Sequence, residues 1–145
     1  FIQNIGTGTV CDLAWGAKVQ GYSKRELNDP LVSAQLWIII RVEHDEYTIR
    51  NAMSCTYMDI QASAKLHFDW FATRAKPSKN MSSKLARWTI RRNNNKTAYL
   101  TSTWLAGTYH SLCMMGTENG TKIQIWEGIG PSTNHQLQLW HVVRA

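Results

Sequence analysis

Short extended segments, in which apolar or β-branched residues alternate with polar ones, recur along the whole chain. Turn-forming residues separate them at intervals of roughly 8–12 residues, a spacing typical of an all-β sandwich or barrel. No 11-residue window shows helical periodicity, and the apolar run 38–40 is short and β-branched, which favours a strand. Asn119-Gly120 predicts a hairpin turn. The expected strands cover residues 1–4, 9–13, 18–22, 35–42, 48–51, 56–60, 65–68, 86–90, 99–101, 111–114 and 122–126, and residues 134–143 close the chain.

The spacing of three tryptophans reveals an internal repeat. Trp37, Trp88 and Trp140 lie 51 and 52 residues apart, and each ends a triplet: Gln-Leu-Trp, Ala-Arg-Trp and again Gln-Leu-Trp. A regular period indicates a fold built from copies of one unit. Alternation along a strand would put the Gln and Trp of a triplet on one face, so we predict that the triplets belong to the core. The predicted units, of four short strands each, cover residues 1–46, 47–96 and 97–145.

Composition is consistent with one domain spanning residues 1–145. Of the 145 residues, 43% are hydrophobic and 18% are charged, which is ordinary for a globular protein. The formal charge of +6 raises the question of an anionic partner, but the basic residues are spread along the chain. The densest cluster is Arg87, Arg91, Arg92 and Lys96. We interpret it as a solvated surface and do not expect nucleic acid as a partner.

The three cysteines exclude a fully paired disulfide framework because their number is odd. Free, mostly buried thiols in a reducing compartment are expected instead. The chain shows no leader of the secretory type and no apolar run of membrane-spanning length, so a cytoplasmic protein without membrane insertion is predicted, with secretion left open. The sequons at Asn80, Asn95 and Asn119 matter only if the chain is secreted.

Taken together, the repeated motifs resemble those of the ricin-B-type (R-type, Gln-x-Trp) lectins, and most closely the single-domain mushroom lectins. The stretches that carry the resemblance are Thr-Val-Cys-Asp-Leu at 9–13, Val-Gln-Gly-Tyr at 19–22, Ile-Gln-Ile-Trp at 123–126 and the two Gln-Leu-Trp triplets. They occur in the same order twice over, and the repeats together cover nearly the whole chain. The resemblance implies a β-trefoil, in which six strands form a short barrel, six cap it and a pseudo-threefold axis relates the repeats.

The resemblance also implies that each repeat binds a sugar through an Asp, an aromatic residue and an Asn or Gln. These groups suit a pyranose, because a carboxylate accepts two hydroxyl hydrogen bonds, a ring covers the C–H face and an amide both donates and accepts. In the first repeat the matching residues are Asp12, Tyr22 and Asn28, with Asp29 as a rival to Asn28. The alternative role for Asp12 is that of a turn-capping carboxylate.

The second repeat offers Asp59, Trp70 and Asn80. Its strand departs from the pattern because Asp69 stands where the aromatic residue is expected. Trp70 is therefore the expected platform, with Phe68 or Phe71 as alternates, and all three aromatic residues could instead belong to the core. A glycan on Asn80 would block a role in sugar binding.

The third repeat offers Trp126 and Asn134, but Cys113 stands at the position of the aspartate. A thiol cannot supply the paired acceptors of a carboxylate. This site is expected to be weak or inactive unless an acid such as Glu118 reaches into it.

The function implied by the resemblance is that of a lectin for terminal galactose or N-acetylgalactosamine, as in lactose and galactosyl glycans or glycoproteins, without a metal or other cofactor. Shallow sites predict weak single-site affinity, so agglutination would require several sites on one chain or on a homodimer. A β-trefoil protease inhibitor acting through surface loops is the alternative. An enzyme is not expected, because no nucleophile–base pair, metal cluster or phosphate-binding loop is visible in the sequence.

Overall fold

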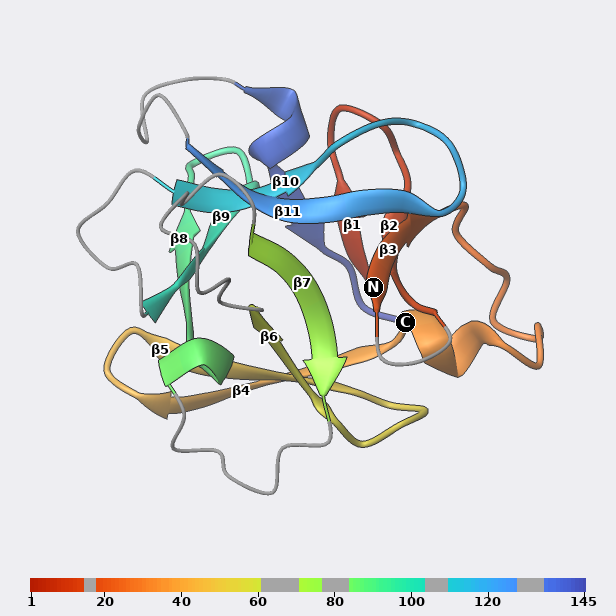
Figure 1. The fold of residues 1–145 in the computed structure, drawn as a ribbon, viewed down its shortest axis with the longest axis horizontal. Helices are drawn as coiled ribbons and strands as arrows, with labels where there is room; N and C mark the ends of the chain where they lie inside the picture. The colour runs from red at the N-terminus through yellow and green to blue at the C-terminus, as the bar shows by residue number, and fades with distance from the viewer. Residues whose placement is uncertain (15–17, 61–70, 77–83, 104–109, 128–134) are drawn as a thin grey trace.

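The chain folds as an all-β protein (Figure 1) in the computed structural model, which describes residues 1–14, 18–60, 71–76, 84–103, 110–127 and 135–145. That part of the chain forms one twelve-stranded sheet with three short 3-10 helices. The strands are β1 (Ile2–Asn4), β2 (Val10–Leu13), β3 (Val19–Tyr22), β4 (Trp37–Glu43), β5 (Glu46–Asn51), β6 (Tyr57–Ile60), β7 (Phe71–Lys76), β8 (Trp88–Arg92), β9 (Ala98–Ser102), β10 (His110–Met114), β11 (Thr121–Glu127) and β12 (Trp140–Val142). The 3-10 helices are η2 (Val32–Gln35), η4 (Lys84–Ala86) and η6 (Gln136–Gln138).

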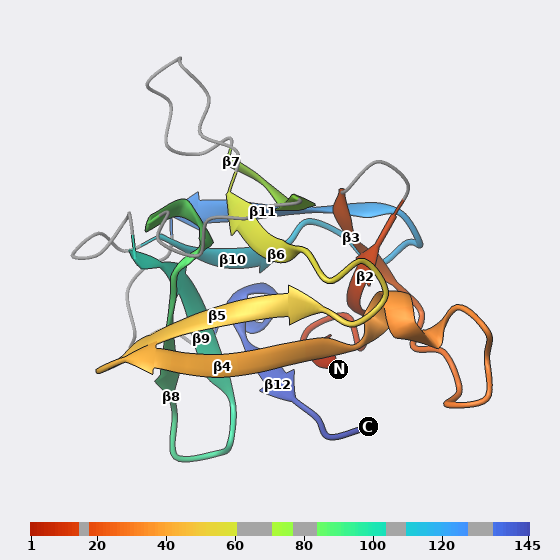
Figure 2. The same cartoon turned by 90° about the horizontal axis from the view of Figure 1, so that it is seen from below.

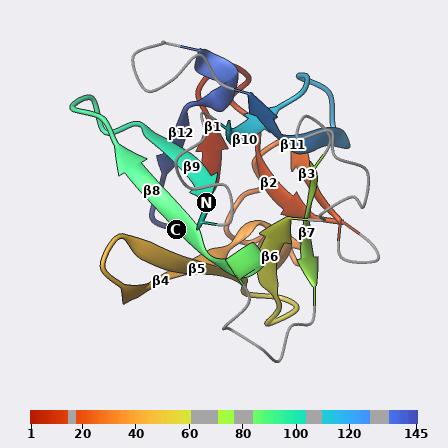
Figure 3. The ribbon, with the colours of Figure 1, turned by 60° about the vertical axis from the view of Figure 1, so that its left-hand side comes forward.

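Two sets of antiparallel hairpins build the fold. Ribbons β4–β5, β8–β9 and β12–β1 each join the last strand of one repeat to the first strand of another, and hairpins β2–β3, β6–β7 and β10–β11 lie within the repeats. Strand β11 also pairs with both β3 and β7, which closes the sheet on itself. Figure 3 shows β1, β12, β9, β8 and β5 following one another around the molecule. The predicted β-trefoil of six barrel and six capping strands is thereby confirmed.

The two ends of the described chain meet in the β12–β1 ribbon. The amino group of Phe1 donates a hydrogen bond of 2.8 Å to the carbonyl of Val143, and the termini lie close together in Figures 1 and 2. Among the described residues, no helix is long and apolar enough to span a bilayer.

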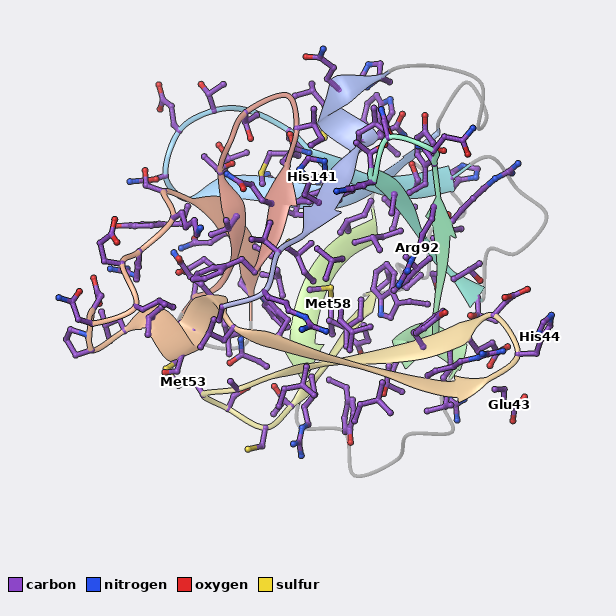
Figure 4. The ribbon with its side chains drawn as sticks, turned by 180° about the vertical axis from the view of Figure 1, so that it is seen from behind. Glu43, His44, Met53, Met58, Arg92 and His141 are labelled. Carbon is purple, nitrogen blue, oxygen red and sulfur yellow. The ribbon has the colours of Figure 1, made fainter. Side chains whose placement is uncertain are left out.

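The three repeat tryptophans fill equivalent places in the core. Each is buried, and each Nε1–H donates a hydrogen bond of 2.9 Å to a backbone carbonyl of the capping hairpin of its own repeat. The acceptors are Cys11, Met58 and Leu112 for Trp37, Trp88 and Trp140 respectively. Figure 4 shows Met58 inside the molecule, whereas Glu43 and His44 mark the exposed tip of the β4–β5 ribbon. Buried indole N–H groups need partners, so these bonds tie the hairpins to the barrel.

The backbone of the triplets differs from the expected one. Gln35, Ala86 and Gln138 each end a 3-10 helix, and the strand begins only at the tryptophan two residues later. The triplet is therefore not continuous strand. Gln35 and Gln138 are nonetheless buried, as predicted. From the ends of their 3-10 helices, Gln35 and Gln138 donate hydrogen bonds to the capping hairpins, to Asp12 in β2 and to the carbonyl of Trp126 in β11.

Two asparagines brace the segments before the tryptophans, a role that the sequence did not suggest. Asn51, paired in register with Trp37, donates from Nδ2 to the carbonyl of Ala34 at 2.9 Å and accepts at Oδ1 from the backbone N–H of Met53 and of Ser54. Asn4, paired with Trp140, makes the equivalent bonds. Ser102, paired with Trp88, is the third copy, and its buried Oγ lacks a hydrogen-bond partner among the described residues. The asparagine brace is thus present in two of three repeats.

Substituting Asn51 with alanine is expected to lower the free energy of unfolding by about 2 kcal/mol, because it leaves one buried carbonyl and two turn N–H groups without their partner. Urea denaturation followed by circular dichroism measures the change. The exposed Asn94 provides the control, since its replacement by alanine should change stability by less than about 0.5 kcal/mol. Equal effects of the two substitutions would contradict the brace.

Candidate functional site

The carboxylate of Asp12 lies at the centre of a polar cluster in the first repeat. Asp12 is in β2, opposite Gln20 of β3, and is only 4% exposed. Its Oδ1 accepts a hydrogen bond from Gln20 Nε2 at 3.3 Å and its Oδ2 accepts one from Gln35 Nε2 at 3.0 Å. These two bonds, one to each oxygen, fix the carboxylate in place.

Gln35, the glutamine of the first triplet, uses its whole amide to organise this cluster. Its Nε2 donates to Asp12 and to the carbonyl of Ser23 at 3.0 Å, and its Oε1 accepts the backbone N–H of Arg25 at 2.8 Å. The triplet glutamine therefore holds both the carboxylate and the start of the loop after β3. The sequence pattern predicts that Gln35 belongs to the core and does not include it in the sugar site.

Tyr22 ends β3, and the side chain of Arg25 covers its ring. The guanidinium carbon lies 4.8 Å from the ring centroid, within the range of a cation–π interaction. The same guanidinium approaches two carboxylates: Nε is 3.9 Å from Asp12 Oδ2, and Nη1 is 3.3 Å from Asp29 Oδ2. Arg25, which the sequence motifs did not single out, therefore contacts both the ring of Tyr22 and the carboxylate of Asp12.

Asn28, the predicted amide of this site, is exposed in the loop between β3 and η2. Its neighbour and rival, Asp29, makes the polar contact toward Asp12 through Arg25. The amides that bond directly to Asp12 are those of Gln20 and Gln35. Gln20 belongs to the Val-Gln-x-aromatic strand, so the motif itself contained the signal for this role.

The strand register identifies the equivalent positions in the second repeat. Asp59, buried in β6, corresponds to Asp12, and it lies opposite Arg74 rather than a glutamine. Lys76 occupies the register position of Tyr22, and Ala86 replaces the triplet glutamine. The expected strand 65–68, the platform Trp70 with its alternate Phe68, and Asn80 lie outside the described residues, and the alternate Phe71 begins β7. At the positions of Gln20 and Gln35, the second repeat therefore has Arg74 and Ala86.

In the third repeat, the register places Cys113 at the position of Asp12 and Trp126 at that of Tyr22. Trp126 is 39% exposed, and its carbonyl accepts a hydrogen bond from Gln138 Nε2 at 3.3 Å. Asn134 lies outside the described residues. Glu118 is exposed in a turn that is attached to the first repeat, where Asn119 Oδ1 accepts from the backbone N–H of Ser23 at 2.7 Å. This repeat thus keeps the aromatic residue and the amide but lacks the carboxylate.

Burial raises the pKa of the Cys113 thiol from its ordinary value of 9.0 to about 11, so the group is neutral at physiological pH. The pKa of Cys11 is raised as well, also by burial. The raised pKa of Cys113 means that this neutral thiol contributes to stability below pH 9 and that the contribution is lost as the pH rises through about 11.

At pH 8, iodoacetamide is therefore expected to alkylate the exposed Cys55 in the native protein and to leave Cys11 and Cys113 unmodified until denaturant is added. Peptide mass spectrometry after labelling checks this pattern. Labelling of Cys113 at the rate of Cys55 would contradict its buried, neutral state.

Comparison with known proteins places the chain in a family. A family described as ricin-type beta-trefoil lectin domain-like matches residues 33–126. A ricin B-like lectin from Macrolepiota procera, solved in complex with lactose, is 22% identical with a TM-score of 0.74, and the alignment covers 99% of this chain and 93% of that one. The Rhizoctonia solani agglutinin is 18% identical with a TM-score of 0.73, covering 99% and 92% of the two chains.

The designed threefold-symmetric protein ThreeFoil is 14% identical with a TM-score of 0.79, covering 99% of this chain and 96% of that one. At these low sequence identities, the structural similarity shows that the chains share a fold and no more. No curated protein sequence matches the chain. The family match covers more than half of the residues, and the chain belongs to the ricin-type beta-trefoil lectin domain-like family.

Proposed function

We propose that this protein is a carbohydrate-binding lectin without enzymatic activity, which recognises terminal galactose or N-acetylgalactosamine mainly through its first repeat. The observation that carries the proposal is the cluster of Asp12, Gln20 and Gln35 beside the ring of Tyr22. The Macrolepiota procera lectin, which was solved with lactose, has the same fold.

The chemistry of the cluster suits a pyranose. A carboxylate such as that of Asp12 can accept hydrogen bonds from sugar hydroxyls, and bonds to a charged acceptor are about twice as strong as neutral ones. The aromatic ring offers an apolar surface for the C–H face. Galactose fits such a pair because its axial 4-hydroxyl and its C–H face can engage one shallow site together.

The repeats are not equivalent in this proposal. The first repeat combines carboxylate, amide brace and aromatic ring. The second lacks the triplet amide at Ala86, and the third lacks the carboxylate at Cys113. A single shallow site predicts a dissociation constant near 1 mM, about −4 kcal/mol. Agglutination of cells would then require weaker sites on the same chain or a homodimer, because avidity multiplies single-site affinity.

Titration with galactose, lactose, N-acetylgalactosamine and glucose, followed by tryptophan fluorescence, tests the proposal. The three galacto-configured sugars are expected to change the emission at millimolar concentration, and glucose, whose 4-hydroxyl is equatorial, is the matched control. A response to none of them, together with inhibition of a serine or cysteine protease, would replace the lectin by an inhibitor of the same fold.

A further inference from the structure

The side chain of Arg25 lies where the candidate site of the first repeat would receive a sugar. It covers a face of the Tyr22 ring with its guanidinium at 4.8 Å, and it approaches the carboxylate of Asp12 to 3.9 Å. Apolar ring face and carboxylate are the two surfaces on which the proposed recognition of a pyranose depends. The arginine side chain is only 20% exposed, so it is packed into the site rather than extended into solvent.

We propose that Arg25 acts as an internal competitor, which must leave the Tyr22 ring before a sugar can stack on that face, and that it thereby sets the affinity of the first repeat. The proposal rests on the lectin function proposed above. A protein whose competent state is only partly populated binds with its intrinsic affinity reduced by that fraction. Arg25 would therefore weaken binding without disturbing the hydrogen bonds that hold Asp12.

The backbone of Arg25 is anchored by a hydrogen bond, whereas its side chain is held by weaker contacts. Its backbone N–H donates to Gln35 Oε1 at 2.8 Å, which anchors the main chain. Its guanidinium is held at the outer end by Asp29, whose other oxygen is fixed by the backbone N–H of Leu31 at 2.7 Å. In the proposed release, the guanidinium leaves the ring by rotation about the side-chain bonds while the main chain stays anchored.

The inner end of the guanidinium is poorly satisfied. Nε is buried without a hydrogen-bond partner among the described residues, because its separation of 3.9 Å from Asp12 Oδ2 is too long for a hydrogen bond. A buried donor without a partner destabilises the arrangement that contains it. Among the described residues, this position of Arg25 is held by the ring contact, the ion pair with Asp29 and the long, 3.9 Å ion pair with Asp12. The ring contact and the partly exposed pair with Asp29 are weak interactions that a ligand can displace.

The substitution Arg25→Ala tests the proposal through the sign of its effect on lactose affinity. Fluorescence titration is expected to show binding about tenfold tighter than in the wild type. This gain corresponds to a wild type in which Arg25 has left the Tyr22 ring in about a tenth of the molecules. Asp29→Asn, which loosens the outer ion pair, should tighten binding by a smaller factor. Arg41→Ala, at an exposed arginine of the β4–β5 ribbon, is the matched control and should leave affinity unchanged.

The outcomes separate the two proposals. If the wild type binds lactose and Arg25→Ala binds it equally or more weakly, Arg25 is a bystander or a sugar ligand, and the competitor role is overturned while the lectin function stands. If neither protein responds to any sugar, both proposals fall. Thermal unfolding of Arg25→Ala close to that of the wild type shows that a change in affinity does not come from misfolding.

A ring-current measurement needs no sugar at all. In the wild type, the side-chain methylene protons of Arg25 should resonate upfield because of the Tyr22 ring, and Tyr22→Leu should remove that shift. Absence of the shift in the wild type would overturn the stacked position of Arg25 directly.

Discussion

Substitution of Trp140 by alanine is expected to lower the free energy of unfolding by about 3–5 kcal/mol, the usual range for removing a buried tryptophan. Trp140 is fully buried, its Nε1–H bonds to the carbonyl of Leu112, and its backbone pairs with both β1 and β9. The variant would lose core contacts, leave a cavity and release the β10–β11 hairpin from the barrel. Urea denaturation monitored by circular dichroism measures the loss.

Trp126→Ala is the matched control, because Trp126 has the same side chain on the exposed side of β11. Its replacement should cost less than about 1 kcal/mol. If the two variants lost comparable free energy of unfolding, the repeat tryptophans would not be the main stabilising residues of the core.

Replacement of Asp12 by alanine is expected to weaken lactose binding by about a hundredfold, which puts it beyond detection for a millimolar site. The estimate follows from the loss of two hydrogen bonds to a charged acceptor, each contributing about 1.5 kcal/mol or more. The variant also leaves the amides of Gln20 and Gln35 without their shared partner, so stability should fall by about 1–3 kcal/mol. Titration with lactose, at a temperature well below the unfolding transition, separates the two effects.

Asp59→Ala is the control for this prediction, since Asp59 occupies the same register position in a repeat without the triplet glutamine. It should weaken binding far less than Asp12→Ala. A larger loss in Asp59→Ala would move the principal site from the first repeat to the second.

Much of the fold could be predicted because its determinants are local or periodic. The alternation at residues 10–13, 57–60 and 122–126 predicts strands β2, β6 and most of β11, and the spacing of Trp37, Trp88 and Trp140 predicts the threefold arrangement. The register then places Cys113 at the position of Asp12, in agreement with the motif alignment. Hydrophobic periodicity and repeat length are properties of the sequence alone, and they are therefore accessible without coordinates.

The local backbone of the triplet could not be predicted in the same way. A Gln and a Trp two residues apart would share a face in a continuous strand. They are also both buried here, where a 3-10 helix ends at the Gln and a strand begins at the Trp. Burial alone does not distinguish these arrangements. In the observed arrangement, Gln35 stands at the end of the 3-10 helix and bonds to Asp12, Ser23 and Arg25 together.

The composition of the site was predicted only in part for a related reason. Asp12 and Tyr22 follow from motifs on paired strands, whose register brings them together. Arg25 lies in a loop that carries no recurring pattern, and its place over the Tyr22 ring depends on Asp29 and on a glutamine ten residues away. Such contacts arise from the path of one particular loop, so family motifs do not encode them.

The most direct test of the central claim, that the Asp12 cluster of the first repeat binds sugar, is a heteronuclear NMR titration of the isotope-labelled protein with lactose. The side-chain amide signals of Gln20 and Gln35, and the backbone signals of Tyr22 and Arg25, are expected to shift together with one dissociation constant in the millimolar range. No shift at saturating lactose, or shifts confined to the surroundings of Trp126 in the third repeat, would contradict it.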